Sequence, residues 1–176
     1  FTFALNHVGG LLLKWYRDNL GLPEARDAAK TGSDPYEAIL EKVPEGPSRL
    51  MVLPHFNGSG TPTCDVNSRG AIVGLTIAST RHDIVRAMLE SQTYELKINM
   101  DAMNAAGVPV SDLIAAGGGA KSPLWLQIRA DVLNCPVRTL RIREAACLGA
   151  AILAGKGAGA YSSLKEGVKA TVFFEK

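Results

Sequence analysis

A run of three glycines, Gly117-Gly118-Gly119, constrains the fold of this 176-residue chain more than any other feature. The run follows a short apolar segment, residues 112–116, and precedes an amphipathic segment, residues 122–133, with Pro123 in its first turn. Together these patterns predict a strand, a glycine turn and a helix, in that order. Strand and helix patterns alternate along the rest of the chain as well, which predicts the α/β class.

The other expected elements follow from periodicity and from start and stop signals. We expect helices over residues 11–20, 35–43, 80–106 and 144–154, and strands over residues 50–53, 70–75 and 137–142. Gly21 and Pro23 are expected to end the first helix, and Thr80 to cap the longest one with Asp83 three residues on. Residues 144–154 are almost free of polar side chains, which predicts a buried, closely packed helix. Residues 55–69 form a polar loop of a length typical of functional or flexible segments.

Composition narrows the class of protein. The length predicts a single domain, residues 1–176, and the net charge of +2 argues against nucleic-acid and membrane-surface partners. No apolar run is long enough to span a bilayer. The three cysteines lack CxxC spacing, so we expect reduced thiols in a cytoplasmic protein. Because the chain starts at Phe1 inside an apolar stretch, we expect it to be a piece of a longer protein.

The glycine turn has several interpretations. Bare backbone before a helix N-terminus suits a phosphate. A Walker A loop fails, because Ala115 and Ala120 stand where it needs glycines. A dinucleotide-binding fingerprint would need its third glycine at position 122, where this chain has Ser122. Glu144 follows the next strand, roughly where such sites have a ribose-binding acid, so this alternative stays open. An actin-like nucleotide turn and simple tight strand–helix packing also fit the pattern.

Other polar residues give weaker signals. His7, His55 and His82 lack metal-ligand spacing, so no metal site is predicted. His55 lies beside the loop, where it could touch a ligand, but it is interpreted as a surface histidine. Asp83 and Glu90 lie two turns apart on one helix face, a spacing typical of capping or solvated carboxylates. No carboxylate of this chain has the setting of a general base, so no catalytic residue is assigned.

Four stretches, taken in order, resemble the FGGY carbohydrate kinases. Residues 70–75 followed by residues 83–90 resemble the C-terminal signature of that family, and residues 117–131 resemble its adenosine-binding turn and helix. Residues 144–151 resemble the helix that packs behind that turn in this family. Residues 6–10, together with Lys14 and Trp15, also match the family pattern. The resemblance covers nearly the whole chain.

This resemblance implies a ribonuclease H-like α/β domain of the actin-like ATPase superfamily, incomplete, with a mixed sheet flanked by helices. It implies ATP and Mg²⁺ as cofactors and transfer of the γ-phosphoryl group to a sugar hydroxyl. The catalytic aspartate and the sugar-binding domain would lie outside this chain, which alone would be inactive. The resemblance places the nucleotide at five residues: Gly117, Gly118, Gly119, Lys121 and Ser122.

The chain departs from the xylulokinase-like pattern in the polar loop. Many relatives have Gly-Glu-Arg-Thr-Pro where this chain has residues 58–62, Gly-Ser-Gly-Thr-Pro, so the ionic bracing of the loop is expected to be lost. The resemblance puts pentuloses such as xylulose first as acceptors and leaves glycerol, ribulose, fuculose and gluconate open. The oligomeric state also stays open, a homodimer being one option. The alternative functions are a non-catalytic actin-like interaction domain and, less favoured, a dinucleotide-binding oxidoreductase domain.

Overall fold

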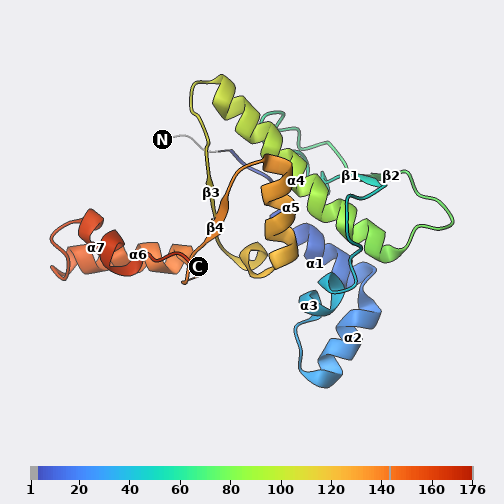
Figure 1. Cartoon of the computed structure of the whole chain (residues 1–176), viewed down its shortest axis with the longest axis horizontal. Helices are drawn as coiled ribbons and strands as arrows, with labels where there is room; N and C mark the ends of the chain where they lie inside the picture. The colour runs from blue at the N-terminus through green and yellow to red at the C-terminus, as the bar shows by residue number, and fades with distance from the viewer. Residues whose placement is uncertain (1–3, 143, 176) are drawn as a thin grey trace. The chain divides into compact units, whose positions relative to one another are not determined.

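The computed structural model describes residues 4–142 and 144–175 and has both helices and strands (Figure 1). The contacts divide the chain into two compact units. Unit 1 runs up to Val110 and includes residues 127–134, and unit 2 comprises residues 111–126 and the chain from Cys135 on. The elements in chain order are α1 (Gly9–Asn19), α2 (Leu22–Thr31), α3 (Pro35–Leu40), β1 (Met51–Leu53), β2 (Ala71–Val73), α4 (Arg81–Ala105), β3 (Leu113–Ala115), the 3₁₀ helix η1 (Gly118–Lys121), α5 (Pro123–Leu133), β4 (Val137–Thr139), α6 (Ala145–Gly157) and α7 (Leu164–Thr171).

Unit 1 is built around helix α4, which contacts both α1 and strand β1. β1 pairs with β2 in antiparallel fashion, with Val52 opposite Ile72. The core consists of apolar side chains that α1 and α4 turn toward the interior, together with residues from α3 and β1: Leu12, Leu13, Tyr16, Ile39, Val52, Val85, Met88 and Leu89. Each large side chain buried in this way contributes roughly 1.5–3 kcal/mol to folding.

The start of α4 has the predicted capping box. The Thr80 hydroxyl accepts the Asp83 backbone N–H at 3.3 Å, and the Asp83 carboxylate accepts the Thr80 backbone N–H at 2.7 Å. Two of the otherwise unpaired donors at the helix start are thereby satisfied. At the other end, Gly107 adopts φ +80°, the left-handed conformation that commonly ends a helix.

Helix α2 is absent from the sequence-based expectations. Gly21 and Pro23 do end α1, as expected, but Pro23 also lies in the first turn of α2. Proline fits there because the first N–H groups of a helix have no intrahelical partner. Gly32, at φ +70°, ends α2. A stop signal for one helix is therefore a start signal for the next.

Unit 2 contains the parallel pair β3–β4, with Ile114 opposite Arg138. Beyond β4, an antiparallel bridge joins Leu140 to Phe174, and the Glu175 N–H donates to the Thr139 carbonyl at 2.9 Å. Parallel and antiparallel pairings therefore meet in this unit. Among the described residues, however, they are not continuous with β1–β2, so the two sheets are separate and small.

Helix α6 forms as expected, but the expectation of burial is wrong. Only Ile152 is buried, while Leu153 is 62% exposed. Helix α7 packs against α6, and the Tyr161 ring lies close to both helices, because an added Cβ at Gly155 or Gly167 would lie 2.7 Å or 2.9 Å from its atoms. A helix as apolar as α6 is expected to be packed against neighbours on all sides, but within unit 2 only α7 packs against it, on one side.

Across the described part of the chain, no helix combines the length and apolar character that a membrane span needs.

Candidate functional site

The glycine turn connects β3 to α5 through the short helix η1 in place of a plain tight turn. Gly117 has φ +77° and ψ −165°, a conformation accessible essentially only to glycine. The Ala120 N–H then donates to the Gly117 carbonyl at 3.1 Å, which closes the 3₁₀ turn before α5 begins at Pro123. The predicted order of strand, glycine segment and helix is therefore confirmed.

Space is open above the first two glycines of the turn. A Cβ built on Gly117 or on Gly118 meets no heavy atom within 4 Å. At Gly60 and Gly70, by contrast, a Cβ would lie 1.9 Å and 2.1 Å from protein atoms. The packing of the chain on itself therefore requires the absence of side chains at Gly60 and Gly70. The positive φ explains the glycine at position 117, whereas neither packing nor a positive φ requires one at position 118.

The two polar residues after the glycines differ in their surroundings. The Ser122 hydroxyl accepts the Trp125 backbone N–H at 3.2 Å, and Ser122 is 9% exposed. It therefore caps the start of α5, where the helix dipole places partial positive charge. Lys121 is exposed on the surface. The contacts of Gly117, Gly118, Gly119, Lys121 and Ser122 with a nucleotide remain predictions.

A charged pair fastens the two strands beneath the turn. Asp112, at the start of β3, pairs with Arg138 of β4. The Arg138 guanidinium also lies 4.4 Å from the centre of the Phe174 ring, which is a cation–π contact. Phe174 belongs to the C-terminal segment that forms the antiparallel bridge with Leu140. These contacts hold the strand that leads into the glycine turn.

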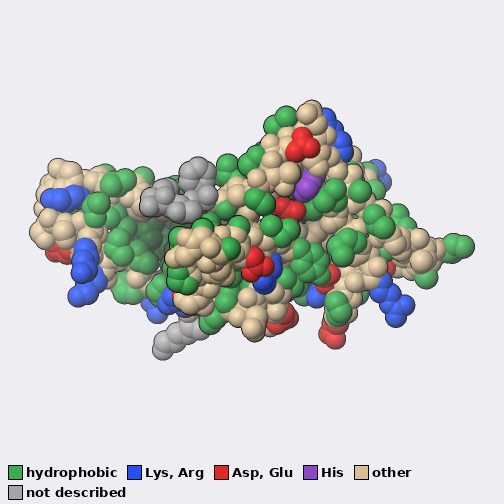
Figure 2. All heavy atoms as spheres, turned by 90° about the horizontal axis from the view of Figure 1, so that it is seen from above, with side chains coloured by type: hydrophobic (Ala, Val, Ile, Leu, Met, Phe, Trp, Pro, Cys, Tyr) green, Lys and Arg blue, Asp and Glu red, His purple; other side chains and the backbone are tan. Residues whose placement is uncertain are grey.

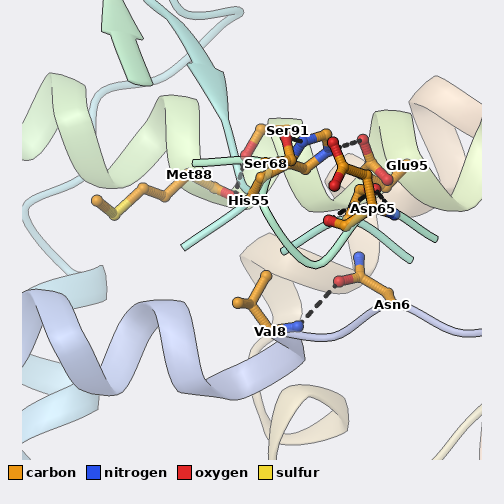
Figure 3. Close-up of polar contacts among 9 residues, drawn as sticks. Asn6, Val8, His55, Asp65, Ser68, Met88, Ser91 and Glu95 are labelled. Atoms are coloured by element: carbon orange, nitrogen blue, oxygen red, sulfur yellow. Dashed lines mark hydrogen bonds and ion pairs between the residues drawn. The ribbon is translucent and has the colours of Figure 1, made fainter. Parts of the chain in front are cut away.

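A second polar cluster, in unit 1, joins the loop of residues 55–69 to helix α4 (Figure 3). His55 Nδ1 lies 2.7 Å from the Ser68 hydroxyl, and His55 Nε2 lies 3.2 Å from the Glu95 carboxylate. The His55 and Glu95 side chains are only 16% and 15% exposed. The interpretation of His55 as a surface histidine is therefore wrong, because the ring is enclosed and has a partner at each nitrogen.

The loop is braced by hydrogen bonds and close backbone contacts, without the Glu–Arg pair of the related motif. The Ser59 hydroxyl accepts the Asp65 N–H at 2.8 Å, and the Asp65 carbonyl accepts the Ser59 N–H at 2.9 Å. Gly60 lies so close to the Leu5 carbonyl that no side chain fits. The expected loss of ionic bracing at residues 59 and 60 is thus offset by contacts that smaller residues permit.

A buried carboxylate in unit 1 has no counterpart among the sequence-based expectations. The Glu24 side chain is fully buried, and its Oε1 accepts hydrogen bonds from Arg81 at 2.7 Å and from His82 at 3.1 Å. Burial raises the pKa of Glu24, but its backbone N–H, His82 and Arg81 outweigh this and hold the pKa at about 2. The partners lie 57 and 58 residues away in sequence, so no local pattern reveals the cluster.

Comparison with known proteins places these features in a family. Residues 2–158 match the profile of the FGGY family of carbohydrate kinases, C-terminal domain. A glycerol kinase of Variovorax paradoxus is 38% identical over 90% of this chain, and a xylulose kinase of Bacillus subtilis is 31% identical over 94%. These matches cover 31% and 32% of the two relatives, so the chain spans about a third of their length.

Solved structures agree with this result. Ligand-bound xylulose kinase of Lactobacillus acidophilus superposes with a TM-score of 0.73 at 25% identity, over 98% of this chain and 34% of the other. Glycerol kinase of Plasmodium falciparum with ADP gives 0.69 at 27% identity, over 96% and 33%. The glycine turn, the capped helix α4 and the polar loop thus occur together in a chain that belongs to the FGGY family of carbohydrate kinases, as a C-terminal domain.

Proposed function

We propose that this chain is the ATP-binding part of a kinase that transfers the γ-phosphoryl group of ATP to a hydroxyl of a sugar or polyol. The observation that carries the proposal is the open space above Gly117 and Gly118, at the turn between a parallel strand and α5. Family membership and the similarity to the Plasmodium glycerol kinase solved with ADP support a nucleotide as the occupant. We place the enzyme in the cytoplasm, where ATP is supplied.

The residues of the turn have distinct tasks in this proposal. The bare backbone of Gly117, Gly118 and Gly119 admits the adenosine and the α-phosphate, which a Cβ would keep away. Lys121 adds positive charge beside them. Ser122 fixes the start of α5 by accepting the Trp125 N–H, so that the positive end of the helix dipole lies beside the nucleotide. ATP supplies the phosphoryl group.

In this proposal, Mg²⁺ and the general base come from outside the described part of this chain. No three His, Cys, Asp or Glu side chains gather there in a way that suits a metal ion. The ion would enter with the nucleotide and be held largely by phosphate oxygens, as is usual for Mg²⁺ in kinases. The base that takes the hydroxyl proton would come from another part of the longer protein.

For the acceptor we propose a pentulose such as xylulose, with glycerol as the competing substrate. The xylulose kinase structures support the first, and the glycerol kinases at 38–39% identity support the second. Steady-state kinetics of the full-length protein decide between them: the preferred acceptor has the higher kcat/KM. The proposed order is wrong if glycerol has the higher value.

The nucleotide site is tested by Gly118→Val, because a branched side chain fills the open space above the backbone. Calorimetry with Mg-ATP on the full-length protein should show at least a tenfold loss of affinity, about 1.4 kcal/mol. Gly157→Val is the matched control, since Gly157 ends α6 and also has open space at its Cβ position. Unchanged affinity in Gly118→Val contradicts the site. Absence of any binding heat in the unmodified protein favours a non-catalytic interaction domain.

A further inference from the structure

Unit 1 contains a cavity that the proposed nucleotide site does not use. Its volume is about 390 Å³, and it lies among the loop before β1, the loop after β2 and the first two turns of α4. This volume falls within the range of small-molecule sites. The polar side chains that line it are Glu45, Ser48, Arg49, Thr76, Ser79, Asp83 and Arg86.

Arg86 is held in the wall of this cavity by a buried partner. Its Nε donates to Glu90 Oε1 at 2.6 Å, and the two side chains are 11% and 4% exposed. Glu90 is fixed in turn, because its carboxylate oxygens accept the Ser48 backbone N–H at 3.1 Å and the Tyr94 hydroxyl at 3.4 Å. A guanidinium oriented through Nε keeps its two terminal nitrogens available, and these form the fork that binds an oxyanion with two hydrogen bonds.

The remaining lining groups limit the charge of a ligand. Arg49 is exposed and adds a second cation, while Glu45 and Asp83 bring two carboxylates. The Asp83 carboxylate is already engaged, because its Oδ2 accepts the backbone N–H and the hydroxyl of Thr80 at 2.7 Å each. With Glu90 included, three carboxylates face two guanidinium groups, and this charge disfavours a polyanion. The Thr76 and Ser79 hydroxyls lie 3.3 Å apart and bond to each other, and each retains a further hydrogen-bonding position for a hydroxylated molecule.

We propose that this cavity binds a small hydroxylated metabolite through one oxyanion group, a carboxylate or a phosphate monoester, on the forked terminal nitrogens of Arg86. Arg49 closes the mouth of the site over the anion. The inference does not rest on the nucleotide site, because every residue that lines the cavity belongs to unit 1 and the glycine turn belongs to unit 2.

Calorimetry on the chain tests the proposal with four probes: glycerate, glycerol 2-phosphate, inorganic phosphate and uncharged glycerol. We expect saturable binding of glycerate or glycerol 2-phosphate, with the tighter of the two identifying the anion, and no binding of glycerol. If inorganic phosphate binds as tightly as glycerol 2-phosphate, the hydroxyls contribute nothing and that part of the proposal is wrong. Absence of saturable binding by all the anions overturns the whole proposal.

Variants locate the site. The double variant Arg86→Gln/Glu90→Gln removes both buried charges together and should weaken binding at least about tenfold, while Arg49→Gln weakens it less. Arg138→Gln in unit 2 and Gly118→Val should leave binding unchanged. If the double variant does not fold, amide NMR shifts of the unmodified chain decide: the probe should move Ser48, Thr76 and Ser79. Shifts confined to other residues, or full affinity in the double variant, overturn the proposal.

Discussion

At the scale of single residues, Glu24 shows how a charge is kept in the interior of unit 1. Its carboxylate has no exposed surface, and one oxygen receives hydrogen bonds from the Arg81 guanidinium and the His82 ring at the start of α4. Removing one partner of such a group leaves an uncompensated charge, which costs more than the pair itself contributes. The cluster therefore links α2 to α4 in a manner that depends on the ionisation of one side chain.

This ionisation makes the stability of the protein depend on pH. The pKa of Glu24 is about 2 in the folded protein, against 4.5 for the ordinary side chain. The stabilisation is therefore complete above about pH 4.5 and is lost as the pH falls toward 2, by roughly 3 kcal/mol in total. Urea unfolding at several pH values should show this loss in the unmodified chain.

The matched variant for this prediction is Glu24→Gln. It should be less stable than the unmodified chain at pH 7 by a similar amount, and the difference should shrink as the pH approaches 2. A difference between the two proteins that stays constant from pH 7 to pH 2 would contradict the assignment of this dependence to Glu24.

At the scale of elements, the polar loop is ordered by its contacts with α4 and with itself. His55 connects the loop to the helix because its two ring nitrogens reach Ser68 on one side and Glu95 on the other. The Asp65 carboxylate accepts the Asn67 N–H at 2.8 Å, which fixes the turn before Ser68. A long loop with such contacts is tethered to the folded unit although most of its residues are exposed.

Replacement of His55 by leucine, which keeps the bulk but not the hydrogen bonds, tests this role. Hydrogen exchange at the Asn67 and Ser68 amides should become about tenfold faster, because the loop opens more often when the tether is missing. Glu95→Gln retains an acceptor for the ring N–H and should preserve most of the protection. Equal exchange in the His55→Leu variant and the unmodified chain would show that the tether does not hold the loop.

Comparison of the expected and observed elements shows which features local sequence patterns can predict. The capping box at Thr80 and the segment from β3 through the glycines to α5 are local patterns, and the structure confirms both. The burial of α6 depends on what packs around it, which no local pattern contains, and that expectation is wrong. The tether at His55 joins residues 40 positions apart, so composition and spacing could not reveal it.

At the scale of the whole molecule, many large apolar side chains are exposed to solvent. Figure 2 shows apolar side chains at the surface among the charged ones. In unit 2 the exposed large side chains include three on α6 and α7: Leu153, Leu164 and Val168. Exposed apolar groups of this kind promote association and dye binding when they form a continuous patch.

The pair Ile152 and Leu153 offers a direct test. Leu153→Lys should leave the unfolding temperature nearly unchanged, while it lowers the binding of an apolar fluorescent dye and the tendency of the chain to associate. Ile152→Lys should instead disrupt the packing of α6 against α7, because Ile152 is only 6% exposed. Light scattering and thermal unfolding of both variants check the prediction, and similar behaviour of the two would contradict it.

The contact between Leu5 and Thr61 has a consequence for the design of variants. The two residues exchange hydrogen bonds, Thr61 N–H to the Leu5 carbonyl at 2.9 Å and Leu5 N–H to the Thr61 hydroxyl at 3.1 Å, while Gly60 lies against the same carbonyl. A Glu-Arg loop of the kind seen in related motifs therefore cannot be grafted into this protein alone. Its arginine at position 60 would displace the segment around Leu5, so the two segments must be exchanged as one unit.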